Sequence, residues 1–137
     1  MKRTGFALLA AVSFACAHEA KPKEQLQSWN QRHPEAAQEL CAWIAQHPRA
    51  SDRLMLWEGH NGARAEELLR WATDNPGYGW QTFVAQHRDW KDYAAIAAQH
   101  PRAANQFLDW ARRNPEAAQD LLEHDGALRF AGKRRAC

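Results

Sequence analysis

The sequence predicts an all-α protein made of short helices, each formed by one unit of a repeat about 14 residues long. Tryptophans recur at intervals of 14 residues, and His-Pro or Asn-Pro dipeptides punctuate the chain at the same spacing. Within each unit Ala, Leu and Trp fall at helical spacing and form one apolar face. We expect these helices to pack as a small α-solenoid or as a compact multi-helix bundle.

Residues 1–15 show the features of a signal peptide in the expected order. Lys2 and Arg3 supply positive charge, and the 11 residues from Gly5 to Ala15 carry none. This stretch is too short to span a bilayer as a helix, but it has the length of a signal-peptide apolar region. We therefore expect the chain to be exported.

Two cleavage sites are compatible with this leader. Residues 15–17, Ala-Cys-Ala, fit a small-x-small site after Ala17, which would release a soluble periplasmic or secreted protein beginning at His18. Residues 13–16, Ser-Phe-Ala-Cys, resemble the lipobox of bacterial lipoproteins, whose common form is Leu-small-small-Cys. The last two residues match that form and the first two depart from it. The resemblance implies cleavage before Cys16, a lipid on this cysteine and anchoring to a membrane of the cell envelope.

A linker at 16–24 precedes the repeat domain, which we place at 25–131, and a basic tail follows at 132–137. The repeat consensus is P-x-A-A-x-x-L-x-x-W-x-x-x-[H/N]. The tryptophans of the aromatic position are Trp29, Trp43, Trp57, Trp71 and Trp110. Helices of about 11 residues are marginal in isolation, so neighbouring helices must cover these rings. We expect all five to face inward.

Each unit predicts one helix. Complete units begin at Pro34, Pro48, Gly62 and Pro101, shortened units cover 76–87 and 88–100, and partial units end at His33 and span 115–132. Proline suits the first helical position, and Ala and Leu favour the helix interior. At the end of a unit, Asn is expected to adopt left-handed geometry, and His to interact with the helix dipole. A single helix kinked at every proline is disfavoured, because it would expose the tryptophan stripe to water.

The chain has three cysteines, Cys16, Cys41 and Cys137. If Cys16 carries a lipid, an even pair remains in an oxidising compartment. A disulfide between Cys41 and Cys137 would then fix the tail to an early helix. Alternatively, Cys41 is a small core residue, since other units place Met or Leu at its position, and burial is expected in either case.

Charge argues against a nucleic-acid partner. The chain has 18 Lys and Arg and 16 Asp and Glu, so removal of Lys2 and Arg3 with the leader leaves 16 against 16. The signs alternate along the chain, and no basic face remains to attract nucleic acid. Only Lys133, Arg134 and Arg135 form a cationic cluster, which would either contact anionic headgroups of an anchoring membrane or remain solvated.

The sequence shows no catalytic or metal-binding constellation. His33, His47, His87 and His100 recur at the end of a unit, so a helix-end role explains them more simply than a metal site does. The chain beyond the leader holds Ser28 and Ser51, neither in a nucleophile motif, and no glycine-rich phosphate loop. We therefore expect no enzyme activity, cofactor or metal. The chain is interpreted as a structural or protein-interaction module with an unidentified protein partner.

The irregular segment 76–93 supports an alternative function. Its aromatic and imidazole rings could form a binding patch for a small ligand or glycan, made of Tyr78, Trp80, His87 and Trp90. Departures from a repeat often mark binding faces. The competing interpretation is that the repeat has drifted here and these rings fill the gap between shortened units.

Overall fold

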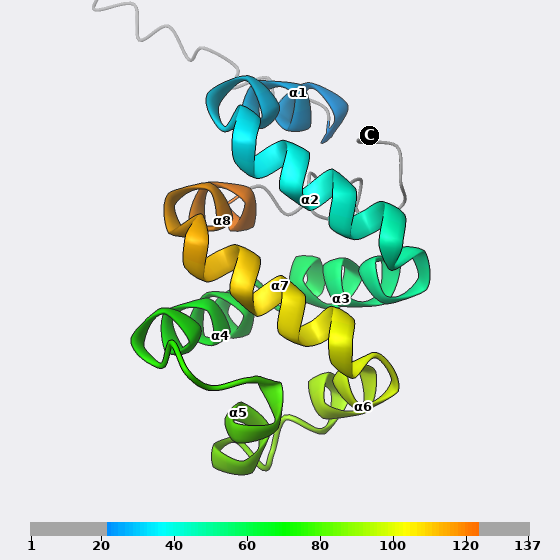
Figure 1. Cartoon of the computed structure of the whole chain (residues 1–137), viewed down its shortest axis with the longest axis vertical. Helices are drawn as coiled ribbons and strands as arrows, with labels where there is room; N and C mark the ends of the chain where they lie inside the picture. The colour runs from blue at the N-terminus through cyan, green and yellow to red at the C-terminus, as the bar shows by residue number, and fades with distance from the viewer. Residues whose placement is uncertain (1–21, 124–137) are drawn as a thin grey trace, which may run out of the picture.

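A computed structural model of the chain describes residues 22–123, so the predicted signal peptide, Cys16, Cys137 and the basic tail lie outside the described part. This part forms eight helices and no strand (Figure 1). The helices are α1 (Pro22–Arg32), α2 (Pro34–Gln46), α3 (Pro48–His60), α4 (Gly62–Asp74), α5 (Trp80–Gln86), α6 (Lys91–Gln99), α7 (Pro101–Arg113) and α8 (Pro115–Leu122). The all-α prediction is confirmed.

Helix boundaries follow the repeat closely. In complete units the helix begins at the predicted Pro or Gly and ends at the next-to-last residue of the unit. His47 alone therefore separates α2 from α3. The two shortened units differ, because α5 and α6 begin only at Trp80 and Lys91. Their first residues form the turns that connect α4 to α5 and α5 to α6.

His47 is both the C-cap of α2 and the N-cap of α3. The N–H of His47 donates to the Trp43 carbonyl over 2.9 Å, and the His47 carbonyl accepts from the N–H of Ser51 over 2.8 Å. Its φ of −131° and ψ of 62° are outside helical geometry. The left-handed geometry predicted for asparagine is wrong, since Asn61 and Asn114 have φ of −128° and −129°. Each must also begin the next helix, and an N-cap residue takes negative φ outside the helical region.

The alternation of His and Asn at the junctions has a structural explanation. The amides of Asn61, Asn75 and Asn114 each donate through Nδ2 to the carbonyl of the tryptophan four residues earlier, over 2.8 to 3.0 Å. His87 places Nδ1 2.9 Å from the equivalent carbonyl, that of Phe83. Both side chains carry a nitrogen at the δ position, so either can satisfy an orphan carbonyl of the last turn.

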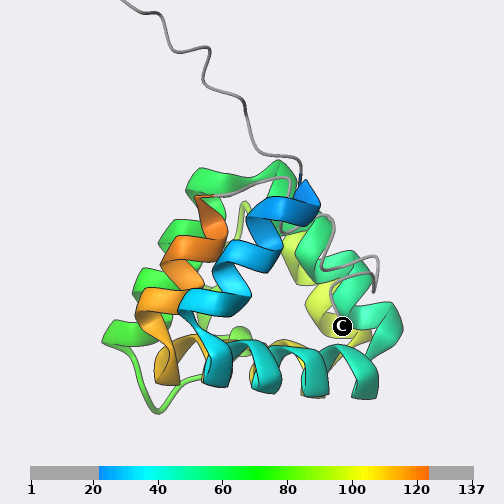
Figure 2. The same ribbon diagram turned by 90° about the horizontal axis from the view of Figure 1, so that it is seen from above.

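The bundle is organised around α2 and α7, which lie side by side and run in opposite directions (Figure 1). On either side of this pair α1 packs on α8, and α3 packs on α6. Figure 2, the view from above, shows α1 and α8 beside each other. Because the first and last helices of residues 22–123 touch, the architecture is a closed multi-helix bundle and not an open solenoid.

Two reciprocal hydrogen bonds join α2 and α7. The indole Nε1 of Trp43 on α2 donates to the carbonyl of Ala103 on α7 over 3.1 Å. In the reverse direction, the Nε1 of Trp110 on α7 donates to the carbonyl of Ala36 on α2 over 3.0 Å. Both bonds run from the tenth position of one unit to the third position of the other. The repeat therefore supplies a self-complementary helix pair.

Tryptophan packing confirms most of the predicted core. Trp29, Trp43, Trp57 and Trp110 are buried. Trp71 is only half-buried, so its predicted inward position is wrong in part; its Nε1 donates to Gln86 at the surface over 2.9 Å. The ring lies against Phe83 of α5, a helix of only 7 residues, which offers less cover than the 13-residue helices elsewhere.

The described helices are too short or too polar to cross a membrane. Cys41 is half-buried, whereas the residues at its position in other units, Met55, Leu69, Leu108 and Leu122, are all buried. The prediction that Cys41 is buried is therefore only partly correct, because part of its side chain is exposed. Cys41 is disulfide-bonded, and the prediction that it pairs with Cys137 stays a prediction because that residue lies outside the described range.

Candidate binding groove

Two copies of one five-residue pattern line an open groove. Residues 32–36 read Arg-His-Pro-Glu-Ala and connect α1 to α2, and residues 113–117 read Arg-Asn-Pro-Glu-Ala and connect α7 to α8. Together they enclose a volume of about 500 Å³. We call this the junction groove. Its two walls are 81 residues apart in the sequence and face each other because α1 packs on α8.

Buried tryptophans fix the two walls of the junction groove. Trp29 donates its Nε1 hydrogen to the carbonyl of Ala117 over 2.8 Å, which joins α1 to the first turn of α8. Its ring centroid lies 6.3 Å from that of Trp110, which donates to Ala36 in the first turn of α2. Both indoles are almost inaccessible to solvent. The groove therefore lies on a rigid part of the core.

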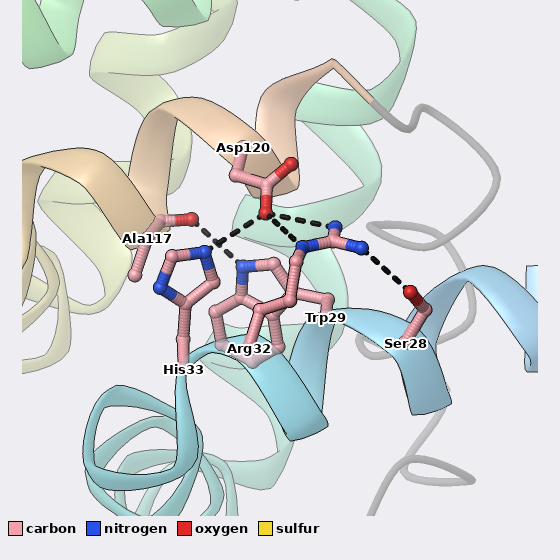
Figure 3. Close-up of polar contacts among 6 residues, drawn as sticks. All are labelled: Ser28, Trp29, Arg32, His33, Ala117 and Asp120. Atoms are coloured by element: carbon pink, nitrogen blue, oxygen red, sulfur yellow. Dashed lines mark hydrogen bonds and ion pairs between the residues drawn. The ribbon is translucent and has the colours of Figure 1, made fainter.

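A carboxylate-centred network crosses one side of the groove (Figure 3). Asp120 of α8 accepts two hydrogen bonds from Arg32, over 3.0 Å from Nε and 2.8 Å from Nη2. Its same oxygen lies 2.8 Å from Nε2 of His33. The remaining terminal nitrogen of Arg32 donates to Ser28 Oγ over 2.6 Å. This network connects the end of α1 to α8 by charge-assisted bonds.

The network changes the acidity of Asp120. Partial burial by itself raises the pKa of this carboxyl, but hydrogen bonds from Arg32 and His33, together with their charge, outweigh burial. The net result is a pKa below the ordinary aspartate value, so the carboxylate form is favoured. Asp120 therefore stays ionised under conditions in which a free aspartate would begin to take up protons.

Only some of the charged side chains in the junction groove form ion pairs with described residues. Arg32 is paired with Asp120, and Arg113 lies 3.4 Å from Glu39. Glu35 and Glu116 are exposed, and neither belongs to an ion pair within residues 22–123. Both stand in the first turn of a helix, where the helix dipole stabilises their negative charge. The groove thus offers two exposed carboxyl groups to an incoming group.

The four rings predicted as a binding patch do not line one site. Tyr78 is 56% exposed and lines a separate cavity of about 220 Å³ with Asn105 and Arg112. Trp80 is half-buried against the core, and its indole nitrogen has no hydrogen-bond partner among the described residues. His87 and Trp90 lie elsewhere, in the aromatic cluster described next.

His87 and Trp90 belong to an aromatic cluster in and around the core. The His87 ring stacks on Phe83 with centroids 4.0 Å apart and planes 17° apart. Trp90 is buried and meets Phe83 edge-on at 4.8 Å, while Arg64 lies 4.8 Å above its ring. The structure thus places Trp90 in the core and Tyr78 at the surface.

Arg112 organises the irregular connection between α4 and α5. Its guanidinium donates to the carbonyl of Ala72 over 2.8 Å, to that of Asn75 over 3.1 Å, and also to that of Tyr78. The Ala72 carbonyl lies in the last turn of α4, and the carbonyls of Asn75 and Tyr78 belong to the connection that follows it. In the sequence, Arg112 occupies an ordinary solvent position of its unit, so no local signal indicates this role.

The described residues contain no group of three or more His, Cys, Asp or Glu side chains placed to hold a metal ion. The junction histidines form different contacts: His33 lies against Asp120, His47 lies 2.6 Å from Oε1 of Gln106, and His87 contacts the Phe83 carbonyl.

The residues of the junction groove are visible in the sequence as the paired motifs RHPEA and RNPEA. The repeat pattern predicts helix ends at these residues and gives no sign of a site. The pairing of the two motifs depends on the contact between α1 and α8, which no local pattern encodes.

Comparison with protein-family models, with curated proteins and with solved structures found no match to this chain.

Proposed function

We propose that this chain is an exported, non-catalytic protein-interaction module of the bacterial cell envelope, and that it binds its partner at the junction groove. The observation that carries the proposal is the groove itself, where two equivalent helix junctions present charged side chains and are held in place by the buried Trp29 and Trp110. Export is supported by the composition of residues 1–15, and membrane anchoring by the lipobox-like residues that end at Cys16.

The occupant that fits the junction groove is a short extended segment of a partner protein with basic side chains. The guanidiniums of Arg32 and Arg113 at the groove are already close to carboxylates of this chain. In contrast, Glu35 and Glu116 belong to no ion pair within residues 22–123. A lysine or arginine side chain would complement these two carboxylates. The first turns of α2 and α8 have no side-chain cap, so their main-chain N–H groups also remain for the carbonyls of an extended segment.

A binding experiment tests this assignment directly. A Lys/Arg-containing unstructured peptide and an acidic peptide of the same length are titrated into ¹⁵N-labelled protein. We expect shifts from the basic peptide at 32–36, at 113–117 and at the indole N–H signals of Trp29 and Trp110. The double variant Glu35→Gln/Glu116→Gln should weaken binding by about tenfold or more, since it removes two charge-assisted contacts.

The control variant Glu66→Gln/Asp89→Asn removes the same charge from other surfaces. It should bind the basic peptide with nearly the affinity of the parent protein. Equal weakening in both double variants would show a non-specific effect of net charge, and shifts located outside the two motifs would reject the junction groove as the site.

The proposed export and membrane anchoring are tested by the intact mass of the mature chain. A chain that begins at Cys16 with added diacylglycerol is lipid-anchored, and a chain that begins at His18 is a released protein. Cys16→Ser should abolish the lipid mass in the first case. A full-length chain that retains Met1 in the cytoplasm would contradict export altogether.

A second candidate function is supported by the exposure of Tyr78. This ring stands at 56% exposure beside a cavity of about 220 Å³ that Asp109 and Arg112 also line. An exposed ring next to polar groups suits stacking with a sugar or another small polar ligand. Quenching of tryptophan fluorescence by cell-wall sugars, lost in Tyr78→Ala but kept in Glu35→Gln/Glu116→Gln, would favour it over the junction groove.

A further inference from the structure

Glu58 occupies a position that most other units fill with apolar residues. It follows the aromatic position directly, and the equivalent residues of α2, α4, α6 and α7 are Ile44, Ala72, Ala97 and Ala111, all buried. Glu58 is buried as deeply as these residues, with 1% of its surface exposed. A carboxylic acid therefore stands in a core position of α3.

No group of the described chain compensates this acid. Neither Oε1 nor Oε2 of Glu58 has a hydrogen-bond partner within residues 22–123. Burial without a partner disfavours the charged form, and it raises the pKa of the Glu58 carboxyl well above the ordinary glutamate value. Ionisation in the folded state must therefore be accompanied by exposure to water or by a local rearrangement.

The elements packed against α3 offer little to stabilise a charge. Helices α2, α4 and α7 contribute to the core only residues that cannot ionise. Helix α6 contributes Tyr93, and burial, followed by the nearby Glu58 carboxyl, raises the pKa of its phenol. At the edge of this interface Asp92 accepts from Trp57 Nε1 over 2.9 Å and lies 3.3 Å from Arg64 of α4. Asp92 and Arg64, the charged pair described at this interface, thus already form an ion pair with each other.

The C-terminal end of α3 is also a weakly stabilised part of the helix. Gly59 lies within its last turn, where glycine lowers helix stability. The next helix begins with Gly62, whereas α2, α3, α7 and α8 begin with proline. A negative charge on Glu58, close to the C-terminus of α3, is also disfavoured by the helix dipole. These features coincide at residues 58–62.

We propose that the α3–α4 junction is a pH-sensitive hinge, in which ionisation of Glu58 opens the contact between α3 and α6 while the pairing of α2 with α7 persists. The hinge is a property of the fold and does not depend on occupation of the junction groove. Opening exposes the Trp57 and Tyr93 rings, which pack with their centroids 5.0 Å apart in the closed form.

The direction of the pH effect follows from linkage. In the opened form Glu58 titrates near its ordinary value of about 4.3, and in the closed form it titrates at higher pH. Between these two values the opened form binds fewer protons, so each pH unit increases opening by up to about tenfold. Below the lower value both forms are protonated, and opening no longer depends on this group.

Hydrogen exchange tests the hinge. Exchange of the full chain is followed from pH 5 to pH 9, and each rate is divided by the intrinsic rate at that pH. We expect opening of α3 and α6 to increase with pH in the parent protein and to be nearly constant in Glu58→Gln. Glu58→Ala should behave in the same way, and it is expected to fold because Ala is the residue of α4, α6 and α7 at this position.

The control Glu116→Gln removes an exposed carboxylate and should leave the pH dependence of α3 and α6 unchanged. The hinge is rejected if the parent protein shows no pH-dependent opening, or if both Glu58 variants retain it. It is also rejected if α2 and α7 open with the same pH dependence as α3, since that result means global unfolding rather than a local hinge.

Discussion

The indole of Trp110 donates a hydrogen bond of 3.0 Å to the main-chain carbonyl of Ala36, and this bond fastens α7 to the first turn of α2. The carbonyl belongs to the third residue of α2, and Trp43 forms the matching bond to the third residue of α7. Each unit thus supplies both a donor, at its tenth position, and an acceptor, at its third. This relationship gives the tryptophan at the tenth position its role, whereas the acceptor is a main-chain carbonyl that any residue at the third position supplies.

Replacement of Trp110 by phenylalanine is expected to destabilise the fold by about 1–3 kcal/mol, because it removes a buried hydrogen bond and opens a small cavity. Trp71→Phe is the matched control. Its bond to Gln86 lies at the surface, and the loss should stay below about 1 kcal/mol. Urea unfolding followed by circular dichroism measures both. Equal losses would contradict the importance assigned to the bond between α7 and α2.

The junction position is expected to accept His or Asn but not Ala. Asn61→Ala removes the donor to the Trp57 carbonyl and should cost about 1 kcal/mol. Asn61→His should retain most of the stability, because His87 forms the same contact through Nδ1. Thermal unfolding of the two variants at pH 7 compares them. A histidine variant as unstable as the alanine variant would show that the side-chain bond is not what selects these residues.

Gly79 and Gly77 are expected to respond differently to alanine. A Cβ at Gly79 would lie 2.5 Å from Oδ1 of Asn105, the atom that accepts the N–H of Trp80 at the start of α5. Gly79→Ala should therefore displace Asn105 and cost about 1–2 kcal/mol. A Cβ at Gly77 meets no atom within 4 Å, and Gly77→Ala should be almost neutral. Chemical denaturation distinguishes the two, and destabilisation by Gly77→Ala alone would contradict the packing at Asn105.

Asp120 is expected to make the fold sensitive to acid. Its pKa is lower in the folded state than in the unfolded chain, so its contribution is present above the ordinary aspartate value of about 3.9 and disappears as pH falls through the folded value. The contribution should be modest, at most about 1 kcal/mol, because Arg32 is exposed to solvent. Melting temperatures of the parent and Asp120→Asn between pH 2 and pH 7 should converge at the acid end. A constant difference over this range would exclude the linkage.

Much of the fold could be predicted because the repeat encodes it locally. Pro34, Pro48 and Pro101 mark helix starts, and the His before each marks a helix end, so the sequence predicts these boundaries to within a residue. The tertiary arrangement could not be predicted. Contact between α1 and α8 arises from the angle that each junction imposes, and the choice between bundle and solenoid depends on the sum of these angles.

Predicting the site was harder for a related reason. Trp90 and Tyr78 both depart from the consensus, yet one fills the core and the other lies at the surface. Composition alone cannot separate these outcomes, because an aromatic ring suits both a cavity and an exposed patch. The residue type of Glu58 likewise favours exposure to solvent, although its position in the unit, shared with Ala72, is a buried one. That position is the signal that could have identified it.

The single-residue junctions limit how the chain can change in length. A residue added inside α2 or α7 would turn everything after it by about 100° around the helix axis, and the indoles would no longer reach their acceptors on the opposite helix. Length variation is tolerable where a turn rather than a helix takes it up. The two shortened units show this, since the segments before Trp80 and Lys91 absorb the missing residues and leave the register of α7 intact. Insertions between 75 and 79 should therefore be accepted far more readily than insertions at His33 or His47.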